Sequence, residues 1–258
     1  MLEAGRLAET RMDKPLSLVI TCEHGGNRIP PRYRQLFRGH EDLLQTHRGH
    51  DPGGLTMAKD LAGAFQATLF VATISRLLVD LNRSIGHPKL YSEATRGAPD
   101  GVRREILEAH YLPYRNQVEA HIAGEVAQGR RVVHISSHSF TPVLDGEVRN
   151  ADIGLLYDPG RATEARLCLD WQAALKSRAP QIRVRRNYPY TGKSDGFTAH
   201  LRRRFAEGAY AGIELEINQQ HVLRGGHGWR GLRKAIISAL QAAITTTPSS
   251  SGKGRSAS

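Results

Sequence analysis

Two histidines stand where apolar runs of this sequence end, and such positions can support metal chemistry. His24 follows the run LSLVITC at 16–22, and His138 ends the run RVVHISSH. Because ligands gather at the carboxyl ends of strands in an open α/β sheet, the two imidazoles can converge on one metal ion. A catalytic zinc takes three protein ligands, and imidazole nitrogen is a good one. The chain has 12 histidines, so a core or surface role for either one is the competing interpretation.

A third ligand is expected from an acidic residue. Asp51, in HRGHDPGG, is the candidate, although Asp before Pro-Gly is also a common N-cap at the start of a helix. Asn27, which follows His24 in CEHGGN, is the alternative, but an amide oxygen ligates zinc poorly. His47 and His50 lie close to Asp51 in the sequence and are available to orient the ligands. We predict that one Zn²⁺ is bound by His24, Asp51 and His138.

Two glutamates alternate with apolar residues in the segment GIELEIN. As a strand, this segment places Glu214 and Glu216 on one face and its apolar residues on the other. A buried glutamate beside a metal-bound water can take a proton from that water and hand it to a leaving amine. An edge strand with both glutamates in solvent gives the same alternation. The pattern leaves both interpretations open, and Glu216 is the candidate for the catalytic base.

Several arginines bracket apolar runs and would suit an anionic ligand. The planar fork of arginine pairs with a carboxylate through two parallel hydrogen bonds. A single arginine is more often a surface residue, but a set that flanks apolar runs favours a pocket for an acidic substrate. The set and its polar neighbours are Arg76, Asn82 and Arg83 around RLLVDL, and Arg186, Asn187, Tyr190 and Lys193 in RRNYPYTG.

The elements that must position these residues alternate between strands and helices. Strands are expected at 16–22, 131–138, 152–157, 181–186 and 212–218, with ATLFVATI and RLLVDL as further short apolar runs. Helices are expected from near Pro52, over about 102–127 with a break or kink near Pro113, at about 160–177, around 198–206 and at 228–244. This alternation predicts an α/β fold, a three-layer sandwich in which a mixed, mostly parallel sheet carries helices on both faces.

Length and composition suit one folded domain. The chain has 258 residues, of which 40% are apolar and 24% charged, so it can bury a large core without structural metals. Residues 15–246 are predicted to form a single domain, and the polar segments 1–14 and 247–258 are predicted to be disordered. No run approaches the roughly 20 apolar residues of a membrane helix, and the start lacks the apolar core of a signal peptide. The two cysteines, Cys22 and Cys168, lie far apart, and a cytoplasmic location is expected.

The chain is basic, with 36 Lys and Arg against 25 Asp and Glu and a net charge of +11. Such a surplus can indicate nucleic acid, an anionic lipid surface or small acidic substrates. The basic residues are spread along the chain, aromatic residues make up only 6%, and none of the usual nucleic-acid motifs occurs. We therefore expect neither nucleic acid nor a membrane as a partner, and a small anionic substrate is favoured.

Six motifs together resemble the N-formylglutamate amidohydrolase family. They are CEHGGNRIP, HRGHDPGG, SRLLVDLNRS, HISSHSFTP, RNYPYTG and GIELEIN, in the order and spacing of that family from about residue 16 to 223. DLNR is also similar to the substrate-binding motif of aspartoacylases and succinylglutamate desuccinylases. The resemblance implies the zinc-carboxypeptidase architecture, with a mixed sheet of about eight strands between helices. It also implies a zinc-dependent amidohydrolase that cleaves a small anionic N-acyl amino acid such as N-formyl-L-glutamate.

The resemblance implies roles around the metal, with two departures. His24 and His138 match the two metal histidines, and Glu216 matches the catalytic glutamate that activates water. Carboxypeptidase-like relatives carry Glu three residues after the first histidine, where this chain has Asn27, so the carboxylate must come from elsewhere. The second histidine is often preceded, two residues earlier, by Asp, where this chain has Ser136. That difference alters the contacts behind the metal ligand.

The resemblance also implies how the substrate is held. Arg76 looks like the arginine that polarises the scissile carbonyl and stabilises its oxyanion. Asn82 and Arg83 look like the pair that holds the α-carboxylate of the substrate. The segment 186–193 would close over the acidic end of the substrate.

Other classes of function remain open. Cys22 and His24 could share a face of the first strand, as a thiol nucleophile with its base, although a strand cysteine is usually a small core residue. A non-catalytic module could bind an anionic metabolite in the same pocket, although pure binding needs no general base. A different N-acyl amino acid or a short peptide would also satisfy the same residues.

Overall fold

A six-stranded mixed sheet forms the centre of the protein, whose computed structural model describes residues 14–246. The predicted disordered ends, 1–14 and 247–258, lie outside the described residues except for Lys14. The strand order is β2-β1-β3-β8-β6-β7, in which β2, β1, β3 and β8 run parallel, β6 is antiparallel to β8, and β7 is parallel to β6. The strands are β1 (Leu16–Cys22), β2 (Thr68–Val71), β3 (Arg131–Phe140), β6 (Ile153–Leu156), β7 (Val184–Arg186) and β8 (Tyr210–Asn218).

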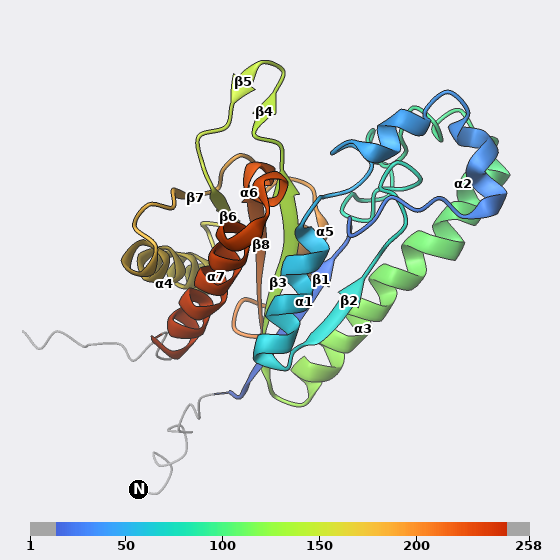
Figure 1. The fold of residues 1–258 in the computed structure, drawn as a ribbon. Helices are drawn as coiled ribbons and strands as arrows, with labels where there is room; N and C mark the ends of the chain where they lie inside the picture. The colour runs from blue at the N-terminus through green and yellow to red at the C-terminus, as the bar shows by residue number, and fades with distance from the viewer. Residues whose placement is uncertain (1–13, 247–258) are drawn as a thin grey trace, which may run out of the picture.

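Helices cover both faces of this sheet, which confirms the predicted three-layer arrangement (Figure 1). One face carries α1, α4 and α7, and the other carries α3 and α5. The helices are α1 (Gly54–Phe65), α2 (Asp100–Ile106), α3 (Leu112–Ala127), α4 (Ala162–Arg178), α5 (Phe197–Arg204), α6 (Gln219–Arg224) and α7 (Gly226–Thr246). None of the helices within residues 14–246 has both the length and the apolar composition needed to cross a membrane.

The alternation of residues in β8 assigns its two faces. Ile213, Leu215 and Ile217 join the apolar cluster beneath α1, α4 and α7, while Glu214 and Glu216 lie on the α3–α5 face. Because β8 pairs with β3 on one side and β6 on the other, it is a central strand and both glutamates are buried. The interpretation of GIELEIN as an edge strand with solvent-exposed glutamates is therefore wrong.

A second apolar cluster stands beside the carboxyl ends of β1 and β2. It packs two short 3₁₀ helices, Pro31–Phe37 and Glu41–Gln45, against the run RLLVDL and the segment that leads into α3. RLLVDL forms a turn, and its apolar side chains are buried in this cluster. Asn82 and Arg83, which follow the run, are therefore held by a turn that packs on this cluster and do not lie at the end of a strand.

The long helical segment over 102–127 is interrupted, as its proline predicts. A π-helical turn at Leu107–Tyr111 joins α2 to α3, directly before Pro113. Proline has no backbone N–H and its ring crowds the preceding turn, so a wider turn relieves the clash.

The central sheet has fewer strands than the expected number of about eight. The two other strands, β4 (Val143–Leu144) and β5 (Glu147–Val148), pair only with each other. They form a hairpin that stands out beyond the carboxyl end of β3 (Figure 1). The architecture is as predicted, and the strand count of the main sheet is lower.

Candidate metal and catalytic site

Polar side chains gather at the carboxyl ends of β1, β3 and β8. His24 comes shortly after β1, and His138 of β3 is the register partner of Glu216 of β8. The exposed fractions of these residues are 1%, 3% and 6% in that order. Polar groups so deeply buried require partners, and their contacts define the site.

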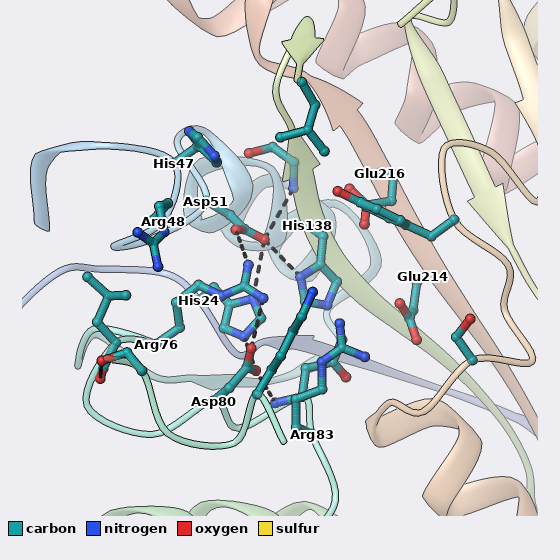
Figure 2. Close-up of a pocket in the computed structure, with 18 of the residues that line it drawn as sticks. His24, His47, Arg48, Asp51, Arg76, Asp80, Arg83, His138, Glu214 and Glu216 are labelled. Carbon is teal, nitrogen blue, oxygen red and sulfur yellow. Dashed lines mark hydrogen bonds and ion pairs between the residues drawn. The ribbon is translucent and has the colours of Figure 1, made fainter. Parts of the chain in front are cut away.

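His24, Asp51 and His138 point toward one another in the pocket (Figure 2). Asp51 Oδ2 lies 2.9 Å from His138 Nδ1 and 3.4 Å from His24 Nδ1. One ligand atom from each of the three residues lies within 4.8 Å of the other two. Two imidazole nitrogens and a carboxylate oxygen make up the donor set of a catalytic zinc site, so the residues fit a divalent cation.

Asp51 belongs to this triad and is not the N-cap of α1. The N-cap is Gly53, and the Asp51 carboxylate turns away from the helix toward the histidines. Burial raises the pKa of Asp51, but the neighbouring histidines and Arg76 outweigh burial and hold that pKa well below its usual range. Asp51 is therefore an ionised carboxylate, as a ligand must be.

Each histidine of the triad is supported on its far nitrogen by a buried carboxylate. His24 Nε2 donates to Asp80 Oδ1 at 2.8 Å. His138 Nε2 lies 2.8 Å from Ser136 Oγ and 3.3 Å from Glu23 Oε2. Sequence reasoning missed both carboxylates, although Glu23 adjoins His24 in CEHGG and Asp80 opens DLNR. Carboxylates in this position orient metal-binding imidazoles and raise their basicity.

Arg76 links the ligand carboxylate to one of the supporting carboxylates. Its Nη1 lies 3.2 Å from Asp51 Oδ1, and its Nη2 lies 2.8 Å from Asp80 Oδ2. The side chain of Arg76 is 27% exposed and lines the pocket. The guanidinium is thus fixed in place beside the triad with its charge open to a ligand.

Glu216 stands across from the triad, in the same pocket (Figure 2). Its Oε2 is buried and has no hydrogen-bond partner within residues 14–246. Burial raises the pKa of Glu216 to about 7, and repulsion from Asp51 and Glu214 adds to burial while His138 opposes it. A carboxyl group in this condition can exchange protons near neutral pH.

The site opens into a pocket of about 450 Å³ whose wall includes Asn82 and Arg83. Asn82 Oδ1 accepts a hydrogen bond from the backbone N–H of Phe197 at 2.6 Å. Arg83 Nη1 donates to the backbone carbonyl of Asp195 at 2.6 Å. These anchors tie both side chains to the start of α5, so the pair is positioned before any ligand arrives.

The predicted segment 186–193 contributes Tyr190 and Thr191 to the pocket wall. Tyr190 lines the pocket, but Arg186, Asn187 and Lys193 do not. Asn187 Oδ1 accepts from two backbone amides, Arg186 donates to a tyrosine hydroxyl at 3.3 Å, and Lys193 Nζ lies 3.7 Å from Asp158 Oδ1. The pocket contains other cations that the sequence analysis did not single out, at Lys89 and Arg96.

The remaining candidates lie apart from the triad. Asn27 Nδ2 donates to the backbone carbonyl of Leu44 at 3.0 Å. His47 lines the pocket, but within the described residues no hydrogen bond joins His47 or His50 to the three ligands. Cys22 packs in the apolar cluster beneath α1, and burial raises the pKa of its thiol well above the usual value. A thiolate nucleophile at this position is disfavoured.

Comparisons with known proteins indicate the family and the fold of the chain. The family model described as N-formylglutamate amidohydrolase matches residues 16–223. A crystal structure of a gene product from Agrobacterium tumefaciens is similar, with a TM-score of 0.77, 29% identity, and coverage of 89% of this chain and 91% of that one. N-formylglutamate amidohydrolase from Ralstonia eutropha is similar in fold, with a TM-score of 0.64, 20% identity, and coverage of 90% and 94%. A comparison with curated proteins gave no match. The family match spans most of the chain and all the residues of the candidate site, so the chain belongs to the N-formylglutamate amidohydrolase family.

Proposed function

We propose that this chain is a zinc-dependent amidohydrolase that cleaves a small anionic N-acyl amino acid such as N-formyl-L-glutamate. The products would be a small acid and the free amino acid. Membership of the family supports amide hydrolysis. The observation that carries the proposal is a buried carboxylate oxygen of Glu216 that has no partner within residues 14–246 and lines the same pocket as the His-Asp-His triad.

The triad supports a single cation site. His24 Nδ1, Asp51 Oδ2 and His138 Nδ1 would hold the ion, and each imidazole has its other nitrogen against a buried polar partner. When bound, a zinc ion supplies Lewis-acid polarisation of an acyl carbonyl and lowers the pKa of water.

Glu216 would move the proton. It removes a proton from water as the water oxygen bonds to the acyl carbon. As the carbon–nitrogen bond breaks, the protonated Glu216 gives that proton to the departing amine, so the carboxylate is regenerated. A pKa of about 7 suits both steps, because a general acid–base works best near the ambient pH.

Arg76 would stabilise the negative charge that develops on the acyl oxygen. Its guanidinium is already held by Asp51 and Asp80, so little reorganisation is needed when that charge appears. Loss of one such preorganised donor typically costs about 3 kcal/mol of transition-state stabilisation.

The substrate carboxylates would meet two groups of polar and basic side chains. Asn82 and Arg83, both anchored to the backbone before α5, suit the α-carboxylate. Lys89 and Arg96 also line the pocket, and neither forms an ion pair within residues 14–246. We assign the acidic end of the substrate to these two cations, with Tyr190 as part of the adjoining wall.

Metal analysis followed by a substrate panel tests this function. We expect about one zinc per chain and, on the zinc-loaded enzyme, the highest kcat/KM for N-acyl derivatives of acidic amino acids. The panel should pair N-formyl-glutamate with N-formyl-leucine, N-acetyl-glutamate and a glutamyl dipeptide. Calorimetric binding of these compounds without product after prolonged incubation would instead identify a non-catalytic binding protein.

A further inference from the structure

Glu23 is a buried carboxylate that the proposed reaction does not use. It directly follows β1, and its side chain is 0% exposed. Its Oε2 accepts a hydrogen bond from Ser136 Oγ at 2.7 Å, and its Oε1 accepts one from the Tyr114 hydroxyl at 3.3 Å. A buried ionised carboxylate is costly without partners, so a reason for its presence must lie in what it contacts.

The contacts of Glu23 determine the direction of a short hydrogen-bond chain. The Ser136 hydroxyl has one hydrogen, and it donates that hydrogen to the Glu23 carboxylate, which can only accept. Toward His138 Nε2, 2.8 Å away, Ser136 Oγ can then act only as an acceptor. His138 Nε2 must therefore carry a proton, which leaves Nδ1 as the nitrogen that can bind a cation.

The other histidine of the triad is arranged in the same way. His24 Nε2 donates to Asp80 Oδ1 at 2.8 Å, and its Nδ1 faces the Asp51 carboxylate. Thus His24 Nε2 contacts a buried carboxylate directly, and His138 Nε2 is linked to one through the Ser136 hydroxyl. Both rings present Nδ1 to the common site. The two supports come from different parts of the fold, since Asp80 follows the RLLVDL turn and Glu23 follows a central strand.

We propose that Glu23, acting through the Ser136 hydroxyl, is a positioning residue that fixes the His138 ring with Nδ1 toward the cation. This inference rests on the metal site of the proposed function. Without Glu23, the Ser136 hydroxyl is free to turn and donate to His138 Nε2. The proton would then move to Nδ1, and the ring would no longer be a competent ligand.

Zinc affinity of purified variants, measured by competition with a chromophoric chelator, tests this role without relying on turnover. We expect Glu23→Ala to weaken zinc binding about 10- to 100-fold. Glu23→Leu keeps a side chain of similar length that cannot accept a hydrogen bond from Ser136, and it serves if the alanine variant does not fold. Circular dichroism and thermal melting of the metal-free proteins show whether each variant is folded.

A relocated carboxylate gives the sharper test. In the double variant Glu23→Ala with Ser136→Asp, the new carboxylate lies on the same face of β3 as His138, two residues earlier, and can accept from Nε2 directly. We expect this variant to recover most of the lost affinity. Glu119→Ala is the matched control, because Glu119 also pairs with a histidine, His200, at 2.8 Å but lies outside the pocket. We expect its zinc affinity to equal that of wild type.

The outcomes separate this inference from the proposed function. Wild-type affinity in folded Glu23 variants, or no recovery in the double variant, overturns the role of Glu23. Zinc binding with the expected variant effects, but no hydrolysis of any N-acyl amino acid, overturns the proposed reaction and leaves Glu23 as a metal-site residue. A wild-type protein that binds no divalent cation overturns both.

Discussion

His138 and Glu216 are directly paired residues on the adjacent parallel strands β3 and β8. Neighbouring strands lie about 4.8 Å apart, so the pairing brings a candidate metal ligand and a buried carboxylate onto one face of the sheet. Both strands are central, and the apolar faces beneath them are packed against helices. The separation between His138 and Glu216 is therefore set by the sheet and not by loops.

Substitution of the candidate base should separate metal binding from turnover. We expect Glu216→Gln to bind zinc as wild type does and to lose more than about nine-tenths of kcat, because the amide cannot accept the proton of water. Zinc content and kcat for the best N-acyl amino acid measure the two effects. Glu214→Gln on the same face of β8 is a suitable comparison, since Glu214 accepts a hydrogen bond from Thr198 and does not stand unpaired. A Glu216→Gln enzyme that retains more than a tenth of the rate would rule out Glu216 as the base.

The buried Glu216 should also make the stability of the metal-free protein depend on pH. Its pKa is raised from 4.5 to about 7, so the folded state binds this proton more tightly than the unfolded state. The associated stability is present below pH 4.5 and is lost as the pH rises through 7, a change of up to about 3 kcal/mol. Glu216→Gln removes this term, so its free energy of unfolding relative to wild type should increase between pH 5 and pH 8. Urea denaturation at the two pH values measures this difference, and an unchanged difference would contradict the assignment.

Inhibitors should distinguish a metal enzyme from a thiol enzyme. We expect chelators to abolish hydrolysis and added zinc to restore it, because three buried ligands converge on one point. Thiol reagents should have no effect on the folded enzyme, since Cys22 and Cys168 are both buried. Activity is measured after dialysis against chelator and after treatment with iodoacetamide. Inactivation by the thiol reagent alone, with modification mapped to Cys22, would instead support Cys22 as the nucleophile.

The preference for an acidic substrate should depend on Lys89 and Arg96. We expect Lys89→Ala and Arg96→Ala to raise KM for N-formyl-glutamate about fivefold each, with much smaller effects on N-formyl-leucine, because a partly exposed ion pair contributes on the order of 1 kcal/mol. The ratio of kcat/KM for the two substrates measures this preference. Arg186→Ala and Lys193→Ala provide the comparison. A larger loss of preference in those two variants would favour the segment predicted from the sequence.

The central features of the site could be predicted because each belongs to a short motif next to an apolar run. His24 and His138 follow strand patterns, and Asp51 stands in a distinctive turn sequence. The structure brings these three together within 4.8 Å. For Glu216, the sequence alone could not separate a buried strand from an edge strand, because that difference depends on which strands lie beside it. Sheet order is a tertiary property, and the alternation of residues does not contain it.

The supporting residues and the pocket wall were harder to predict for a related reason. Glu23 and Asp80 act on histidines through contacts formed only when separate segments pack together. Asn187 was expected to face the substrate, but its side chain accepts hydrogen bonds from two backbone amides of its own region. A polar side chain in a turn can satisfy either the local backbone or a ligand, and residue type does not distinguish the two.

The separation of the three ligand atoms along the chain has a consequence for folding. Asp51 is 27 residues from His24 and 87 residues from His138. A cation held by all three would act as a cross-link that closes two loops, and both loops contribute residues to the second apolar cluster. Such a cross-link disfavours the unfolded chain. Tighter binding of the ion would therefore raise the free energy of unfolding of the protein. Depletion of the ion would then shorten the lifetime of the folded protein as well as remove its activity.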